Sequence, residues 1–315
     1  MIIMKDKPIF TMLVGLVASG KTTYAYKLAE EIGAAVIDSD EYRKILFGDD
    51  SDQSDNAKLF QYMHEVIKKN LKDGNNVVFS ATNLSSKRRR SFLNELTKIP
   101  CEKKCVVMAT PIDKCRDNNN SRNMVVKQHV IDKMYHSFNT PQWYEGWDEI
   151  IITYWDNCRR WDTRDFVYDA MDTNQNNPHH RFSLGGHLSK CMSNYLESVD
   201  AEHYDSTLAE ACLLHDNGKV YTKTFMNSRG ELGDIAHYYS HENVGAYEAL
   251  FCKPLNTDVD ILKLSQIINL HMYPYAFEHE ERNGNYKMRE RYKKLWGEEL
   301  YNNIMTLYAA DVNAH

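Results

Sequence analysis

The sequence predicts an α/β domain, with a parallel sheet covered by helices, followed by an all-α domain. Two patterns carry this prediction. Short continuous apolar runs alternate with segments of helical spacing in the first half, and nearly all apolar spacing beyond residue 165 is helical. The charged and aromatic stretch 156–172 and the turn-forming run 174–178 separate the two patterns. We therefore expect two domains, residues 1–165 and 166–315, and 315 residues suffice for both.

Continuous apolar runs are typical of strands that are buried on both faces, as in a parallel sheet. We expect five such strands, at Ile9–Val14, Ala35–Ile37, Val77–Phe79, Val106–Met108 and Ile150–Ile152. In the second domain we expect helices at Leu184–Leu196, Thr207–Leu214, Glu242–Leu250, Val259–Leu270 and Leu300–Val312.

The composition excludes several classes of protein. A hydrophobic fraction of 43% with 26% charged residues excludes disordered and collagen-like chains. A net charge of −6 argues against binding nucleic acid through bulk charge, although local basic patches remain open. The seven cysteines lack paired spacing, no apolar run is long enough for a membrane span, and Ile9–Val17 lacks a cleavage pattern. We therefore expect reduced thiols and a cytoplasmic protein without membrane association.

A phosphate-binding motif follows the first expected strand directly. Gly15 through Thr22 fits G-x-x-x-x-G-K-[ST] and precedes a helical segment. In that context backbone N–H groups cradle phosphates, Lys21 reaches the outer phosphates and the Thr22 hydroxyl helps to hold Mg²⁺. We therefore expect ATP or another NTP, with Mg²⁺, to contact Gly15, Ser19, Gly20, Lys21, Thr22 and Thr23. The alternative is a glycine-rich turn with an ordinary surface lysine.

The end of the second expected strand carries the acidic run Asp38–Arg43. A carboxylate there can take the proton of an attacking hydroxyl, and an arginine one helical turn later can hold an acceptor phosphate. On spacing alone, a helix N-terminus that is rich in acids because of the helix dipole explains the run equally well.

Three segments of the first domain resemble the 5′-polynucleotide kinase family of phages and bacterial RNA repair. They are Asp40-Glu41-Tyr42-Arg43, Ala81–Leu84 with the basic run that follows it, and Asn119-Asn120-Ser121-Arg122. The resemblance covers most of residues 8–155 and implies a P-loop kinase domain.

The resemblance also implies roles for individual residues. Asp40 would be the general base for a 5′-hydroxyl, Arg43 the clamp on the adjoining phosphate, and Arg122 the lid arginine over the transferring phosphoryl group. Further contacts to the substrate would come from Thr82, Asn83 and Arg88.

The chain departs from the family pattern at two places. Asn118 stands where the family usually has an arginine, and Ser80-Ala81 where it usually has an aspartate. The basic run 87–90 is open to three interpretations. It would grip a nucleic-acid backbone, or form a solvated helix face, or Arg88 or Arg89 would instead reach the nucleotide or acceptor.

Ten of the 13 histidines lie at or beyond residue 179, in less than half of the chain. Taken singly, each is explained by an ordinary core or surface histidine. Taken in order, one set resembles the HD-domain metal-dependent phosphohydrolases over residues 170–315. Its members are His187, His215, Asp216, His241, His271 and Asp311. His237 and His180 are weaker candidates.

The resemblance implies one or two divalent ions, drawn from Mn, Mg, Ni, Co, Fe and Zn. One ion would be held by His187, His215, Asp216 and Asp311. His241 and His271 would complete a second site bridged by Asp216. Lys219 would contact the scissile phosphate or organise its loop. Imidazoles and carboxylates from several helices suit such ions, which polarise a phosphate and activate water.

Together the two resemblances indicate a bifunctional nucleic-acid end-healing enzyme. It would phosphorylate 5′-hydroxyl ends and remove 2′,3′-cyclic or terminal 2′ or 3′ phosphates, preparing RNA or DNA ends for a ligase that acts downstream. One alternative is a nucleoside or sugar kinase fused to a nucleotide phosphohydrolase. Another is a sensor that binds nucleotides or RNA ends without turnover. The choice of RNA or DNA and the oligomeric state stay open.

Overall fold

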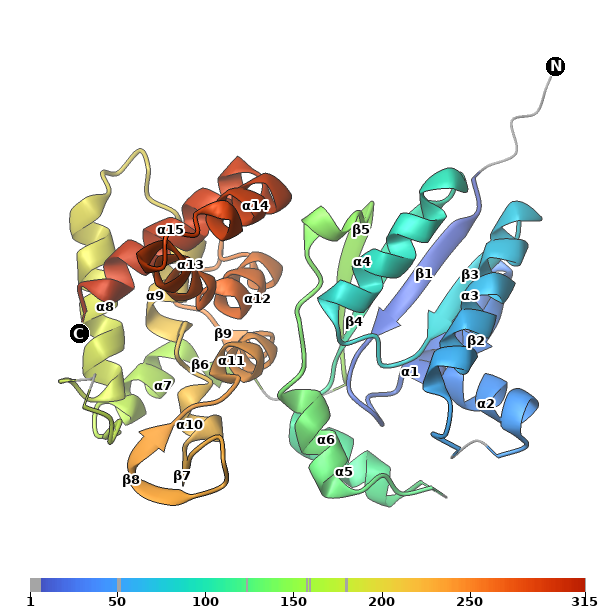
Figure 1. Ribbon diagram of the computed structural model, residues 1–315, viewed down its shortest axis with the longest axis horizontal. Helices are drawn as coiled ribbons and strands as arrows, with labels where there is room; N and C mark the ends of the chain where they lie inside the picture. Colours follow the sequence, from blue (N-terminus) through green and yellow to red (C-terminus); the bar gives the residue numbers. More distant parts are fainter. Residues whose placement is uncertain are drawn as a thin grey trace. The chain divides into compact units, whose positions relative to one another are not determined.

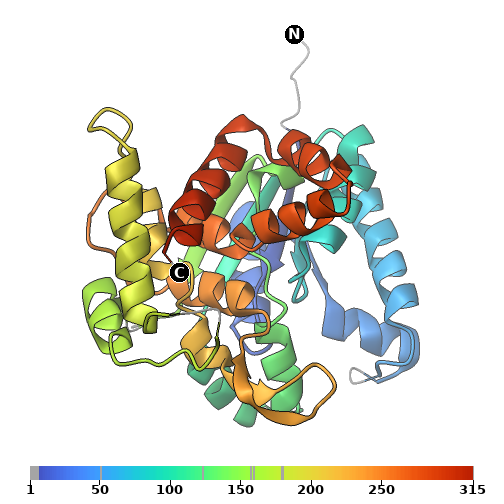
Figure 2. The same cartoon turned by 60° about the vertical axis from the view of Figure 1, so that its left-hand side comes forward.

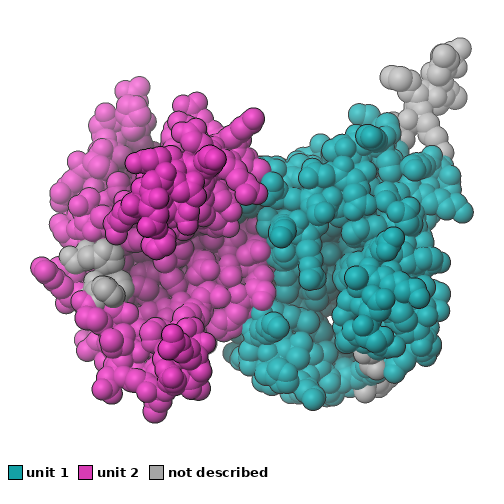
Figure 3. Space-filling model, viewed as in Figure 1, with its two compact units in different colours: residues 1–134, 141–158 teal, residues 135–140, 159–315 magenta. Residues whose placement is uncertain are grey.

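The computed structural model describes residues 7–49, 52–122, 124–156, 158, 160–178 and 181–314. The chain divides into two compact units (Figure 3). Unit 1 contains Met1–Met134 and Pro141–Cys158, and unit 2 contains Tyr135–Thr140 and Arg159–His315. Our predicted boundary at residue 165 thus lies beyond this division. The sequence pattern also gave no sign that the short segment Tyr135–Thr140 belongs to unit 2.

Unit 1 is built on a five-stranded parallel sheet within its described residues (Figure 1). The strands, in the spatial order β2-β3-β1-β4-β5, are β2 (Ala34–Asp38), β3 (Asn76–Ser80), β1 (Ile9–Val14), β4 (Glu102–Ala109) and β5 (Glu149–Tyr154). Every pair in the sheet is parallel. The predicted parallel sheet and its five strands are confirmed.

Helices cover both faces of this sheet. The helices of this part of the chain are α1 (Lys21–Ile32), α2 (Ser39–Phe47), α3 (Asn56–Lys72), α4 (Ser86–Glu95), α5 (Ile112–Asn120) and α6 (Gln128–Tyr135), with 3-10 turns at Leu96–Lys98 and Trp143–Glu145. Of these, α5 and α6 lie beyond the ends of the strands (Figure 1). On one face, α1 packs against Leu13 and Val78. On the other, Phe10 and Phe79 pack against Phe92 of α4. Since successive strand residues face opposite layers, both must be apolar, and the runs are therefore continuous.

Arg89 forms a fully buried ion pair with Glu145. Its Nη2 lies 2.7 Å from Glu145 Oε1 and its Nε donates to Glu145 Oε2 at 2.8 Å. Arg89 Nη1 also donates to the carbonyls of Asn83 and Leu84. None of the three interpretations of the basic run therefore holds for Arg89, because its guanidinium binds Glu145 and these two carbonyls. Opposite charge favours the charged forms here and raises the pKa of Arg89, although burial alone would lower it.

We expect Arg89→Met to destabilise unit 1 by about 3–5 kcal/mol, because the Glu145 carboxylate would be left buried without its cation. Urea denaturation of the full chain measures this effect, and added ATP identifies the transition of the unit that binds it. Lys87→Met removes a neighbouring exposed charge and is the matched control. Equal stability of the two variants would contradict the structural role of the pair.

Unit 2 is mainly helical, as predicted (Figure 2). Its helices are α7 (Thr163–Ala170), α8 (Leu184–Ser198), α9 (Ser206–Leu214), α10 (Lys219–Thr222), α11 (His241–Ala249), α12 (Ile261–Leu270), α13 (Tyr273–Arg282), α14 (Lys287–Trp296) and α15 (Glu298–Val312). The all-α prediction is wrong in one respect, because two short strand pairs occur. They are β6 (Trp161–Asp162) with β9 (Cys252–Lys253), and the hairpin β7 (Thr224–Met226) with β8 (Leu232–His237).

The centre of unit 2 is α9, in which every residue is buried. His215 and Asp216 follow its last residue and so lie in the interior of the unit. The segment Tyr135–Thr140 is fixed to this interior as well. The Tyr135 hydroxyl donates to Glu248 Oε1 at 2.5 Å, and the hydroxyls of Thr140 and Ser265 are 2.8 Å apart.

None of the helices in the described ranges combines the length and the apolar character needed to cross a bilayer.

Candidate active sites

The first candidate site is a cavity of about 680 Å³ at the carboxyl edge of the sheet in unit 1. Its lining includes the loop between β1 and α1 and residues at the ends of the other strands, as expected for a ligand site in an open parallel sheet. Gly20 caps α1 with φ +87°, a conformation that favours glycine. The loop is tied to the next strand end, since Gly15 N donates to the Thr82 carbonyl at 3.1 Å.

Lys21 lies buried at the start of α1 and lines this cavity. Its ammonium donates to the Leu16 carbonyl at 2.5 Å and to Ser19 Oγ at 3.3 Å. Burial lowers the pKa of Lys21 to about 8, with the nearby Asp38 and Asp40 carboxylates acting against this shift. A buried ammonium at a helix N-terminus is poorly hydrated, so its electrostatic attraction to a bound phosphate is strong.

Thr22 is oriented by Asp38, a residue to which the sequence analysis gave no role of its own. Thr22 Oγ1 donates to Asp38 Oδ2 at 3.2 Å, so the hydroxyl lone pairs face away from that carboxylate. Asp38 ends β2 and lies beside Ser80 in the sheet register. The 5′-polynucleotide kinase pattern has an aspartate at the end of β3, where this chain has Ser80-Ala81. Asp38 supplies a carboxylate at the end of the neighbouring strand. Its position as the last residue of a strand was the available signal.

We expect Asp38→Asn to lower turnover of NTP by about 10–100-fold and to raise the Mg²⁺ concentration required, as for other groups that orient a metal ligand. Asparagine keeps the oxygen that accepts from the N–H groups of Asp40 and Glu41 at the start of α2. Asp55→Asn, at the exposed start of α3, is the matched control. An unchanged Mg²⁺ requirement in Asp38→Asn would contradict this role.

Two arginines flank Asp40. Arg43 Nη1 lies 3.0 Å from Asp40 Oδ1, and Arg122 Nη2 lies 3.3 Å from Asp40 Oδ2. Asp40 and Arg122 both line the cavity, whereas Arg43 is buried behind Asp40 and also donates to Asn56 Oδ1. The expected base and lid arginine are therefore brought together, and Arg43 lies where it orients the carboxylate.

The remaining expected contacts divide into two groups. Ser19, Thr22, Thr23 and Thr82 line the cavity, as does Asn118, which donates to the Ala18 carbonyl. Gly15, Asn83 and Arg88 are not among the described residues that line it. Asn83 donates to the Leu13 carbonyl at 2.9 Å, and Arg88 is exposed on α4. The cavity therefore does not support the expected substrate contacts of Asn83 and Arg88.

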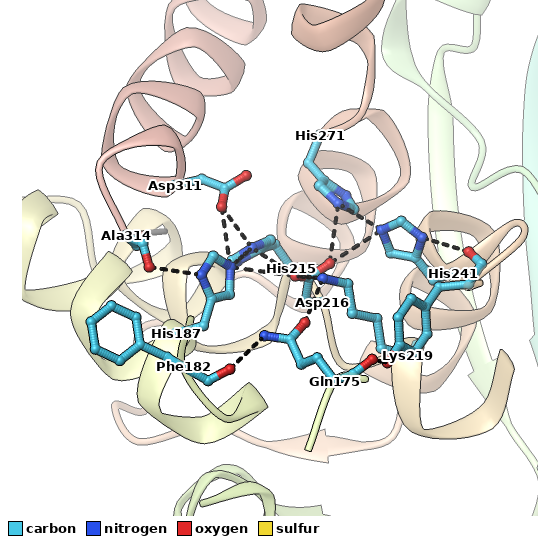
Figure 4. A network of polar contacts seen from close by, with 12 residues as sticks. Gln175, Phe182, His187, His215, Asp216, Lys219, His241, His271, Asp311 and Ala314 are labelled. Carbon is cyan, nitrogen blue, oxygen red and sulfur yellow. Dashed lines mark hydrogen bonds and ion pairs between the residues drawn. The ribbon is translucent and has the colours of Figure 1, made fainter. Parts of the chain in front are cut away.

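The second candidate site is the histidine–aspartate cluster of unit 2 (Figure 4), which the described helices bring together from distant parts of the sequence. Its members are His187 of α8, His215 and Asp216 after α9, His241 of α11, His271 after α12 and Asp311 of α15. All six are buried. They form two groups, one of His187, His215 and Asp311 and one of Asp216, His241 and His271.

Asp216, a member of the second group, directs one carboxylate oxygen toward the histidines of each group. Its Oδ2 is 3.4 Å from the Nε2 atoms of both His187 and His215. Its Oδ1 is 3.1 Å from His241 Nε2 and 3.7 Å from His271 Nε2. This arrangement would let the Asp216 carboxylate face a cation in each group.

The other ring nitrogens fix the orientation of the four histidines. Each Nδ1 faces a backbone carbonyl, at 2.7–3.2 Å, on Ala314, Cys212, Tyr238 and Ile268. Carbonyls only accept, so each Nδ1 carries a proton and Nε2 is the ring atom that each histidine turns to the cluster. The Nε2 atoms of His187 and His215 are 3.2 Å apart, and those of His241 and His271 are 3.3 Å apart. Two nitrogens at this distance need a cation between them, either a proton or a metal ion, so the donor set fits divalent ions.

The electrostatics of the cluster also favour positive charge. Burial alone would raise the pKa of Asp216, but Lys219 and His215 hold it well below its usual value. Conversely, burial alone would lower the pKa of His215, but Asp216 and Asp311 hold it well above its usual value. Burial lowers the pKa of His271. Without a metal ion, the carboxylates thus attract a proton to His215, and a divalent ion would take the place of that proton.

Lys219 lies beside the cluster, where the sequence analysis expected it. Its Nζ is 2.6 Å from Asp216 Oδ2 and donates to Gln175 Oε1 at 3.0 Å. A cavity of about 580 Å³ opens onto Asp216, Lys219, His241, His271 and Asp311. His237 also lines this cavity but belongs to neither group of the cluster. His180 lies outside the described residues.

Comparisons with known proteins concern mainly the phosphate loop and its sheet. Residues 10–141 match the AAA domain family, which is less than half of the chain. The L-seryl-tRNA(Sec) kinase of Methanococcus maripaludis is 23% identical over 177 residues, which are 52% of this chain and 66% of that kinase. The chain thus spans just under two thirds of this curated relative.

Two solved structures illustrate the structural likeness. A chain of the Pnkp1/Rnl/Hen1 RNA repair complex is 22% identical, with 41% of this chain and 43% of that chain covered and a TM-score of 0.38. The APS kinase CysC of Mycobacterium tuberculosis, in complex with AMPPNP and APS, is 19% identical, with coverages of 46% and 88% and a TM-score of 0.37. The parallel sheet, the phosphate loop and the family match together support a P-loop fold of the kinase type in unit 1.

Proposed function

We propose that this chain is a bifunctional enzyme that heals nucleic-acid ends. Unit 1 would transfer the γ-phosphate of an NTP to a 5′-hydroxyl end, and unit 2, as an HD-type phosphohydrolase, would remove a 2′,3′-cyclic or terminal 2′ or 3′ phosphate. The observation that carries the proposal is that one chain contains two candidate sites whose residues are suited to phosphate chemistry. Lys21, Asp40 and Arg122 line one cavity, and Asp216 joins two groups of metal-ligating side chains beside another.

In unit 1 the residues position and neutralise charge, which is most of what phosphoryl transfer requires. Lys21 and the N–H groups at the start of α1 hold the outer phosphates. Mg²⁺, held with the help of Thr22, supplies further neutralisation of the phosphates. Asp40 accepts the proton of the attacking hydroxyl, in an orientation fixed by Arg43, while Arg122 approaches the transferring group.

In unit 2 the six members of the cluster would hold one or two divalent ions, bridged by Asp216. Such ions supply a polarised phosphate and an activated water. Lys219 contributes a fixed positive charge to the phosphate oxygens from its place beside Asp216. The buried position of the cluster strengthens these interactions, because the effective dielectric constant is low there.

The kinase proposal is tested by offering 5′-hydroxyl oligonucleotides of RNA and DNA against nucleosides and sugars with ATP and Mg²⁺. We expect phosphate transfer to oligonucleotide 5′ ends, with the larger kcat/KM for RNA or for DNA giving the preferred acceptor. Phosphorylation of a nucleoside or sugar in place of oligonucleotides would contradict end healing and support the small-molecule alternative. ATP binding without transfer to any acceptor would support the sensor.

The hydrolase proposal is tested separately with oligonucleotides that end in a 3′-phosphate, a 2′-phosphate or a 2′,3′-cyclic phosphate, in the presence of Mn²⁺, Ni²⁺ or Mg²⁺. We expect metal-dependent loss of phosphate or opening of the cyclic ester, which dialysis against a chelator abolishes and added metal restores. Products with a 3′-hydroxyl end would be ready for joining to a 5′-phosphate end by a ligase, the proposed downstream partner. Persistence of all three ends in every metal would contradict the assignment.

A further inference from the structure

One wall of the cavity beside the histidine–aspartate cluster is aromatic. His237 and Tyr239 both line this cavity, and their rings lie 5.4 Å apart and only 10° from parallel. Tyr239 is 44% exposed. Met272, which follows the ligand His271, adds an apolar surface to the same cavity and is 37% exposed. Metal binding and phosphate chemistry use none of these three side chains.

The aromatic wall is held in a fixed relation to the phosphate-contacting lysine. The Ala236 backbone, just before the wall, donates to the Asn176 carbonyl at 2.9 Å and accepts from Asn177 Nδ2 at 3.1 Å. The hydroxyl of Tyr238 donates to the carbonyl of Gln175. The side chain of Gln175 in turn accepts from Lys219, whose ammonium lies 5.4 Å from the Tyr238 ring centre.

These contacts link the segment 237–239 to Lys219 through Gln175. A ligand held by both ends of the cavity would therefore meet a preorganised surface. The cavity has a charged end for a phosphate and an aromatic side for a flat apolar group. At about 580 Å³ it is much larger than a phosphate needs and falls in the range of cavities that bind ligands of nucleotide size.

We infer that the base of a terminal nucleotide stacks on the surface formed by His237 and Tyr239, while the phosphate of that nucleotide lies at the end with Asp216 and Lys219. The inference rests on the proposed phosphohydrolase function and names its substrate class. Stacking tolerates any base, because every base has an aromatic face, so this surface would select a nucleotide without selecting a sequence. A sugar phosphate has no group that uses it.

The test compares two oligonucleotides with the same 3′-phosphate, one ending in a normal nucleotide and the other in an abasic residue. Binding of the 5′-fluorescein-labelled oligonucleotides is followed by anisotropy, and turnover by release of phosphate. All proteins carry Lys21→Ala, so that the phosphate loop of unit 1 contributes little to binding. The variants are Tyr239→Ala, Tyr239→Phe and, as the control, Tyr168→Ala, which truncates a tyrosine of α7 that is 78% exposed.

With Tyr239 present, we expect the end that bears a base to bind about 5- to 100-fold more tightly than the abasic end. Tyr239→Ala should remove most of this preference while leaving affinity and kcat for the abasic end unchanged. Tyr239→Phe and Tyr168→Ala should retain the preference, because the first keeps the ring and the second lies outside the cavity lining. Equal binding of both ends by the protein with Tyr239, or an equal loss for both in Tyr239→Ala, would overturn the inference.

The two readouts separate this inference from the proposed function. Base-dependent binding without release of phosphate would leave the inference standing and contradict hydrolysis. Release of phosphate with the same kcat/KM from both ends would support hydrolysis and contradict the inference. A nucleoside 3′-monophosphate forms a further arm. If it binds as tightly as the oligonucleotide and with the same dependence on Tyr239, the occupant is a free nucleotide, whereas weaker binding assigns a polynucleotide end.

Discussion

Asp216→Asn is expected to abolish phosphate removal by unit 2, with a loss of more than about 100-fold in kcat, while phosphoryl transfer by unit 1 continues. Groups that merely orient metal ligands are worth 10–100-fold, and Asp216 would contribute an oxygen to each of two ions. The substitution preserves the shape of the side chain but removes its charge. Metal analysis of the purified protein by mass spectrometry should show a matching loss of bound ions.

Asp205→Asn is the matched control for this prediction. Asp205 also pairs with a lysine in unit 2, with its Oδ2 2.9 Å from Lys263 Nζ, and asparagine can still cap the start of α9. This variant should keep both its metal and its phosphatase activity. Phosphate release by Asp216→Asn at the rate of Asp205→Asn would contradict a role for the cluster in hydrolysis.

Lys21→Ala is expected to lower phosphoryl transfer by about 10²–10³-fold and to leave phosphate removal intact. Its ammonium is buried in the cavity lining, where a positive charge acts on phosphates with little screening by water. Transfer is measured with labelled ATP and a 5′-hydroxyl oligonucleotide, and phosphate removal with a 3′-phosphate oligonucleotide in the same preparation.

Lys27→Ala is the control for this change, since Lys27 lies on the same helix, is exposed and lines the outer part of the same cavity. We expect it to lower transfer by less than about tenfold, as for a solvent-exposed charge. Equal losses in the two variants would show that general positive charge, rather than the phosphate loop, supports the reaction.

The sequence was sufficient to predict the sheet because its signal is local. Buried strands such as Ile9–Val14 stand out as apolar runs, and the phosphate loop has a motif at fixed spacing. Arg89 shows where this reasoning fails. Nothing near it in the sequence reveals Glu145, 56 residues later, so a buried ion pair looked like part of an exposed basic run.

The histidine–aspartate cluster was predicted as an ordered set by resemblance, and the structure brings that set together. Its geometry had no sequence signal, because the orientation of Asp216 between two pairs of histidines depends on the packing of five helices. The role of Asp38 was missed for a related reason. Its side chain meets Thr22 only because β2 and α1 are neighbours in space. The hairpin of β7 and β8 has too few alternating residues to stand out.

The most direct test of end healing uses one short RNA with a 5′-hydroxyl and a 2′,3′-cyclic phosphate, incubated with ATP, Mg²⁺ and Mn²⁺. Mass spectrometry of fragments reads both ends of the same molecules. We expect gain of one phosphate at the 5′ end, absent with Lys21→Ala, and loss of the terminal phosphate at the other end, absent with Asp216→Asn. Unchanged ends, in a preparation that still binds ATP and holds its metal ions, would contradict the proposed function.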